Sequence, residues 1–63
     1  MNHYRLYGLN AAGGFFRCDE ISAESDEAAI AEAVHLRREH AAELWEQGRM
    51  VQSFAATVRE PAE

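Results

Sequence analysis

The sequence predicts a small α+β domain with the element order ββαββ. We expect a four-stranded antiparallel sheet, in the strand order 2-1-3-4, with one helix packed on one face. The first observation behind this prediction is a single segment, residues 25–40, whose apolar residues recur every three or four positions. The second is a pair of alternating, strand-like segments on each side of it, each pair joined by a turn that contains glycine. A right-handed crossover through the helix places the first strand between the second and third, antiparallel to both.

The first hairpin is predicted from residues 3–9, a turn at 10–14 and a returning strand at 15–21. Alternation places Tyr4 and Leu6 on one face of the first strand and Tyr7 on the other. The two glycines of the turn supply the positive φ that a chain reversal uses. If the turn pairs Leu9 with Phe15, Arg5 lies opposite Asp19, which is a favourable cross-strand charge pair.

The helix is predicted to begin at Ser25, which can cap it with its hydroxyl, and to end between His40 and Glu43. Acidic residues follow the cap and basic residues gather near the other end, as the helix dipole favours. The apolar side of this helix consists of Ala29, Ile30, Ala33 and Val34, with Leu36 at its margin. Because these side chains are mostly small and the helix cannot stand alone in water, it must lie on the sheet.

The second hairpin is predicted from residues 42–46, a turn at Gln47-Gly48 and a strand at 49–55. This closure pairs Glu46 with Arg49, Trp45 with Met50, Leu44 with Val51 and Ala42 with Ser53. An alternative interpretation continues the helix through Trp45. We assign residues 1–58 to a single domain and residues 59–63 to a frayed C-terminal tail.

Composition excludes several classes of function. The chain has 63 residues, a net charge of −5 and one cysteine, Cys18. The negative charge disfavours phosphate backbones and anionic membrane surfaces, so we expect no nucleic-acid or membrane partner. No segment approaches the length of a membrane span, and the N-terminus lacks the pattern of a secretory signal. A cytoplasmic protein is therefore expected. Since neither a disulfide nor a zinc-finger spacing is present, self-association is the expected support for so small a domain.

The helix covers one face of the sheet, and the other face is predicted to carry a large apolar surface. Leu6, Leu44 and Val51 are assigned to the helix side. The opposite face would expose more aromatic surface than a soluble monomer leaves in water, and its residue types are those enriched at interfaces. The predicted interface residues are Tyr7, Leu9, Phe15, Trp45, Met50 and Phe54. The alternative is that some of these side chains wrap round the sheet edges or pack under the C-terminal tail.

No catalytic, cofactor-binding or metal-binding residue is predicted. His35, Glu39 and His40 suggest a metal site, because His35 and Glu39 share a helical face. A metal site needs three or four converging ligands, however, and solvated surface residues explain these three better. Cys18 has no base beside it in the sequence and is interpreted as a small buried core residue. Gly13 and Gly14 lie in a hairpin turn, so they do not form the strand-to-helix loop that cradles a phosphate.

Several features together resemble small uncharacterised bacterial proteins, especially those of alphaproteobacteria. They are HYRLY at the start, a turn with glycine, an acidic cap before an alanine-rich helix, and ELW followed by a glycine turn. The resemblance extends over residues 3–54 and implies a compact ββαβ-type domain without catalytic residues. Gly8 departs from the bulky residue expected at that point of the strand.

The function expected from these observations is that of a small non-catalytic protein that acts through protein–protein contacts and forms a homodimer through the second sheet face, or binds an unidentified protein there. An alternative is a small-ligand binder or enzyme whose pocket forms between subunits, with Arg5 or His3 at its rim. A nucleic-acid-associated regulatory module is a further alternative, which the charge opposes.

Overall fold

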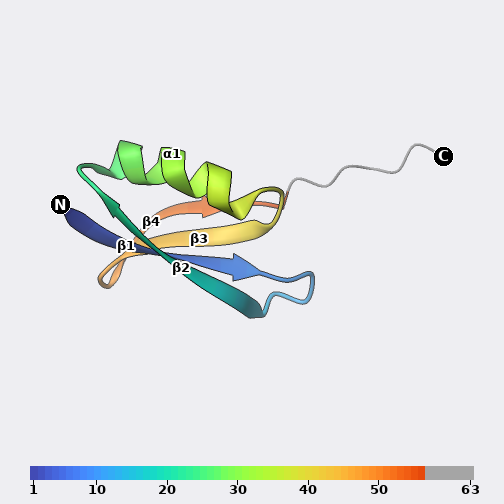
Figure 1. Cartoon of the computed structure of the whole chain (residues 1–63). Helices are drawn as coiled ribbons and strands as arrows, with labels where there is room; N and C mark the ends of the chain where they lie inside the picture. Colours follow the sequence, from blue (N-terminus) through green and yellow to red (C-terminus); the bar gives the residue numbers. More distant parts are fainter. Residues whose placement is uncertain (57–63) are drawn as a thin grey trace.

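The computed structural model describes residues 1–56 and has the predicted architecture. Its strands form one sheet in the order β2-β1-β3-β4, and every neighbouring pair is antiparallel. Figure 1 shows the helix lying across one face of this sheet. The ββαββ order and the strand order 2-1-3-4 are therefore confirmed, whereas the predicted tail at 59–63 lies outside the described residues. The elements are β1 (Asn2–Leu9), β2 (Phe15–Ala23), α1 (Asp26–Arg37), β3 (Ala41–Glu46) and β4 (Arg49–Phe54).

The core lies between α1 and the sheet. Ala29 and Ala33 of the helix are fully buried, as are Ala42 and Leu44 of β3. Because the helix meets the sheet through alanines, its backbone approaches the strands closely. The other buried residues of the core are Tyr4, Leu6, Ile21 and Ala23. Val34 was expected on the buried side but is 48% exposed, so that assignment was wrong.

The N-terminus of α1 is fixed by side-chain hydrogen bonds. Ser25 is the predicted N-cap, and its hydroxyl accepts a hydrogen bond from the backbone amide of Ala28 at 3.2 Å. Asp26 joins this end to two strands, because the Tyr4 hydroxyl donates to its carboxylate at 2.8 Å and both terminal nitrogens of Arg49 donate at 3.2 Å. These hydrogen bonds, those of Arg49 above all, lower the pKa of Asp26 below its usual value.

The helix ends at Arg37, earlier than the predicted end between His40 and Glu43. Arg38 has φ 57° and ψ −115°, and the amide of His40 donates to the carbonyl of Arg37 at 3.0 Å, which closes a tight turn. A positive φ at Arg38 breaks the helical repeat, and the chain enters β3 three residues later. The alternative in which the helix continues through Trp45 is therefore wrong.

A bulge in the first hairpin changes the predicted register. Leu9 pairs with Phe15 as predicted, but the register shifts between Gly8 and Leu9, so that Gly8 pairs with Arg17. Arg5 consequently lies opposite Glu20 and not Asp19. Because side chains alternate between faces, this shift of one residue exchanges the two faces over most of β2.

Gly8 accommodates the extra residue of this bulge. A Cβ atom at Gly8 would lie 3.2 Å from the ring of Phe16 and 2.9 Å from Cγ of Arg17. The Phe16 ring thus occupies the space that a side chain at position 8 would need. This close approach accounts for glycine where the strand pattern predicts a bulky residue.

A second bulge, in the hairpin of β3 and β4, changes the predicted register there as well. Glu46 pairs with Arg49 and Trp45 with Met50, as predicted, and the register then shifts. As a result Leu44 pairs with Gln52 in place of Val51, and Ala42 pairs with Phe54 in place of Ser53.

Phe54 was predicted on the second face of the sheet, and this placement was wrong. It packs against the core on the helix side, where the guanidinium of Arg37 lies 5.1 Å from its ring centroid. Arg37 also donates to the carbonyl of Ala55 at 2.9 Å, which ties the end of α1 to the end of β4. The bulge and these contacts together turn Phe54 toward the helix.

Candidate functional site

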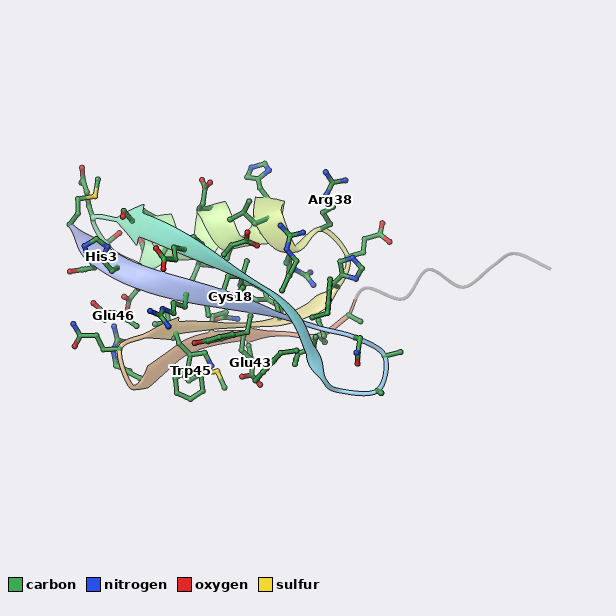
Figure 2. All side chains as sticks on the ribbon, turned by 60° about the horizontal axis from the view of Figure 1, so that its bottom comes forward. His3, Cys18, Arg38, Glu43, Trp45 and Glu46 are labelled. Carbon is green, nitrogen blue, oxygen red and sulfur yellow. The ribbon has the colours of Figure 1, made fainter. Side chains whose placement is uncertain are left out.

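The sheet face opposite α1, called the open face below, is the candidate site. Its residues alternate with the buried ones and pair with one another across the strands. Figure 2 shows Glu43 and Trp45 projecting from the side of the sheet opposite the helix. The large apolar residues of the open face are Tyr7, Leu9, Phe15, Trp45 and Met50. These are five of the six residues predicted for an interface, and only Phe54 lies elsewhere.

The apolar residues of the open face are incompletely covered within one chain. Phe15 is 62% exposed and Met50 is 43% exposed, while Tyr7, Leu9 and Trp45 are half-buried by their neighbours. The rings of Tyr7 and Phe15 contact each other, with centroids 5.1 Å apart. The result is a surface over four strands on which exposed apolar side chains stand among the charged Arg5, Glu20 and Glu43. Exposed apolar groups rimmed by polar residues are typical of binding sites.

Trp45 is held in place by a polar neighbour. Its indole nitrogen donates to the carboxylate of Glu43 at 3.0 Å, two residues earlier on the same face of β3. The indole is therefore oriented before any partner arrives, and Glu43 keeps further lone pairs free to accept hydrogen bonds. A pre-oriented aromatic ring loses little conformational entropy on binding.

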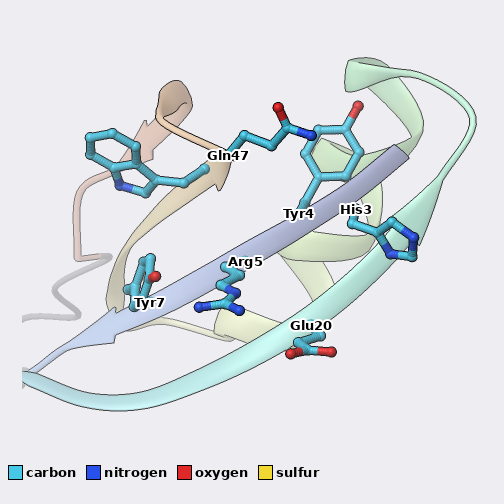
Figure 3. Close-up of a pocket in the computed structure, with 7 residues that line it drawn as sticks. His3, Tyr4, Arg5, Tyr7, Glu20 and Gln47 are labelled. Carbon is cyan, nitrogen blue, oxygen red and sulfur yellow. The ribbon is translucent and has the colours of Figure 1, made fainter. Parts of the chain in front are cut away.

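Beside Trp45 lies a hollow of about 400 Å³, which Arg5 also lines. Figure 3 shows Arg5 and Tyr7 rising from β1, Glu20 from β2 and Gln47 from the turn between β3 and β4. A hydrogen bond to Tyr7, followed by the negative charge of Glu20, raises the pKa of Arg5 above its usual value, so the guanidinium stays protonated. His3 also lines the hollow. The pocket expected between subunits, with Arg5 or His3 at its rim, stays a prediction.

Cys18 belongs to the open face and was missed by the sequence reasoning. It pairs with Tyr7 and is exposed, so its interpretation as a buried core residue was wrong. The error follows from the bulge, since an unbroken register from Leu9 and Phe15 would have placed Cys18 opposite the buried Leu6. On the same face the charge of Arg5 acts on this thiol, and Cys18 is a small, exposed member of the open face.

The two edge strands carry features that oppose strand pairing with another chain. The helix-facing side of β2 bears Arg17 and Asp19, which form an ion pair at 3.0 Å, and a bulge lies near its start. β4 is short and bulged at Val51. Inward charges, short strands and bulges are the usual protection of sheet edges. These features protect the two edges of the sheet but not the open face.

A metal-binding cluster and a membrane-spanning helix are not found in the described part of the chain. Residues 1–56 hold no group of three or more histidine, cysteine or acidic side chains placed to bind a metal ion. His35 lies on α1, whereas Glu39 and His40 lie beyond its end. Among the described helices, none is long and apolar enough to cross a membrane.

Comparisons with protein families, with curated proteins and with solved structures return no match to this chain. The resemblance to small bacterial proteins stays a prediction, and the function rests on the geometry of the open face.

Proposed function

We propose that this chain is a small, non-catalytic cytoplasmic protein that acts through protein–protein contacts, and that it associates with a second copy of itself through the open face. The observation that carries the proposal is the gathering of Tyr7, Leu9, Phe15, Trp45 and Met50 on the single face that α1 leaves uncovered. A second sheet laid on this face completes a sandwich with the apolar side chains inside.

The size of the face sets the expected strength of association. Four strands at about 4.8 Å spacing and six residues at about 3.3 Å each span roughly 20 by 20 Å. Such a face buries about 400 Å² on each chain and about 800 Å² in total, which is below the size of stable specific interfaces and in the range of weak, transient ones. Two chains with a net charge of −5 each also repel one another, so we expect a dissociation constant in the micromolar range at moderate salt.

The single tryptophan gives the experiment its reporter, because Trp45 lies within the proposed contact. The emission of the chain is followed from high to low micromolar concentration at fixed salt. Burial of the indole shifts the emission to shorter wavelength at the concentrated end. An emission spectrum that is constant over the range, with a monomeric mass throughout, contradicts the proposal.

Two substitutions that introduce the same charge test whether the contact lies on the open face or elsewhere on the surface. Met50→Glu places a charge on the open face, and Val34→Glu places the same charge on the exposed side of the helix; the two residues are 43% and 48% exposed. Since burying a methionine contributes about 1.5–3 kcal/mol, Met50→Glu should weaken association by at least about tenfold. Val34→Glu should leave the dissociation constant within about twofold. Equal effects of the two variants would show that the contact lies elsewhere.

A small-ligand site is the second candidate, because the hollow beside Arg5 is of ligand size. In the proposed dimer this hollow lies at the seam between subunits, where a second sheet would enclose it. Retention of a small molecule by the native protein, detected by mass spectrometry of the undenatured complex, favours this function. A mobility-shift assay at low salt is expected to show no retardation of nucleic acid, since the charge opposes it.

A further inference from the structure

The open face carries an ordered pattern that is visible when the strand registers are laid side by side. Reading across β2, β1, β3 and β4, one row consists of Glu20, Arg5, Trp45 and Met50. The next row consists of Cys18, Tyr7, Glu43 and Ser53. The last row is wholly apolar and consists of Phe15, Leu9 and Ala41. At the opposite end the face becomes polar, with His3 and Ser22.

We propose that two copies pack about a two-fold axis that runs parallel to the strands, between β1 and β3. This inference rests on the proposed self-association and specifies its geometry. The axis lies midway between the two packed sheets, above the boundary between β1 and β3, so all four strands overlap those of the partner. β1 then lies on β3 of the second copy, and β2 lies on β4. Sheets aligned in this way pack about 10 Å apart with a small angle between their strands.

This arrangement gives complementary contacts between β1 and the partner's β3 in each of the three rows, while on the outer strands Glu20 faces the partner's Met50. The guanidinium of Arg5 lies over the indole of the partner's Trp45, which is a favourable cation–π contact. The hydroxyl of Tyr7 faces the carboxylate of the partner's Glu43. That carboxylate accepts a hydrogen bond from Trp45 of its own chain and has further lone pairs that can accept another. Leu9 faces the partner's Ala41, so that a large side chain meets a small one. Because the contact is symmetric, each of these pairs occurs twice.

The alternative axis, across the strands, gives poorer contacts. It places each strand on its own copy in the opposite direction. If this axis passes through the row of Arg5, that guanidinium faces the partner's Arg5. If it passes through the row of Glu43, that carboxylate faces the partner's Glu43. Like charges are brought together in both cases. If it passes between those two rows, the apolar end of the face meets the polar end, and Leu9 lies over the partner's His3. The axis parallel to the strands instead matches the apolar end with the apolar end.

A thiol cross-link distinguishes the two arrangements. Cys18 is the only cysteine of the chain and lies on β2, and Ser53 lies in the same row on β4. In the proposed dimer Cys18 faces the partner's Ser53. The variant Ser53→Cys therefore presents two facing thiol pairs to a short bismaleimide, whose two alkenes each add one thiol. Within one chain the same two positions are three strand spacings apart, about 14 Å, so a short linker does not join them.

The expected result is a covalent dimer for Ser53→Cys at concentrations where light scattering shows association, and peptide mapping should join Cys18 to position 53. Three controls should give no covalent dimer: the unsubstituted chain, the double variant Cys18→Ser with Ser53→Cys, and Gln52→Cys. Gln52 is the matched control because it pairs with the buried Leu44 and thus lies on the helix side of β4.

Each outcome has a defined meaning. A covalent dimer of the unsubstituted chain, or of the double variant, overturns the proposed axis and supports packing of each strand on its own copy. A dimer by light scattering that Ser53→Cys fails to trap also overturns the axis but leaves self-association standing. A monomer at all concentrations overturns self-association itself, and the orientation falls with it.

Discussion

Arg38 has a positive φ, a backbone conformation that is unfavourable for a residue with a Cβ atom. Replacing Arg38 with glycine should therefore stabilise the domain. Its φ of 57° and ψ of −115°, with the hydrogen bond from the His40 amide to the Arg37 carbonyl, place it at the second position of a four-residue turn. Turns of this geometry take glycine at that position, because a Cβ atom meets the backbone there. A residue other than glycine in such a region costs about 1–3 kcal/mol.

The substitution Arg38→Gly relieves this cost and adds a smaller one. Glycine gives the unfolded chain more conformational freedom, which offsets about 0.5–1 kcal/mol of the gain. Loss of a positive charge near the helix C-terminus offsets about 0.3–1 kcal/mol more. The net gain should be on the order of 1 kcal/mol, which for a domain of this size raises Tm by about 4–8 °C.

Thermal unfolding followed by circular dichroism measures this shift, and Arg38→Ala is the matched control. Alanine removes the same charge but keeps the Cβ atom, so it should leave Tm unchanged or slightly lowered. If the glycine and alanine variants unfold at the same temperature, the backbone of Arg38 is not strained and the explanation of the early helix end is wrong. Both variants are compared at a concentration where the chain is monomeric, since dimerisation also raises Tm.

Two further predictions concern stability. Hydrogen bonds from Arg49 lower the pKa of Asp26, so this carboxylate stabilises the fold above its unfolded pKa and loses that contribution as the pH falls through its folded pKa. In urea unfolding, the variant Asp26→Asn should therefore be less stable than the unsubstituted chain at neutral pH, and this difference should shrink in acid. A difference that stays constant with pH would contradict the prediction. Gly8→Ala should be destabilising because its Cβ would lie 2.9–3.3 Å from neighbouring side chains, whereas Gly48→Ala has no neighbour within 4 Å and should be neutral or slightly stabilising; equal urea midpoints would show that the strand yields at Gly8.

The element order could be read from the sequence because each element carries its own periodic signal. Ser25 marked the start of the helix, and the glycines at 13 and 48 marked the two turns. The strand order then followed from chain connectivity alone. Gly13 has the positive φ (86°) that such a turn requires, while Gly14 is not among the positive-φ residues.

The errors have two physical sources. A bulge adds one residue without a distinctive sequence, and each of the two bulges exchanged the faces of nearby residues, which misplaced Cys18 in the core and Phe54 on the open face. The early end of the helix depends on Arg38 adopting a positive φ without being glycine. Local propensity does not reveal such a residue, because residues other than glycine rarely adopt a positive φ.

The most direct test of the proposed function is the mass of the unsubstituted chain in solution, measured by light scattering through a dilution series at moderate salt. We expect about twice the 7.1 kDa of one chain at high micromolar concentration, falling to the monomer mass on dilution. A mass of one chain at every concentration would contradict self-association through the open face and leave that surface for a different partner.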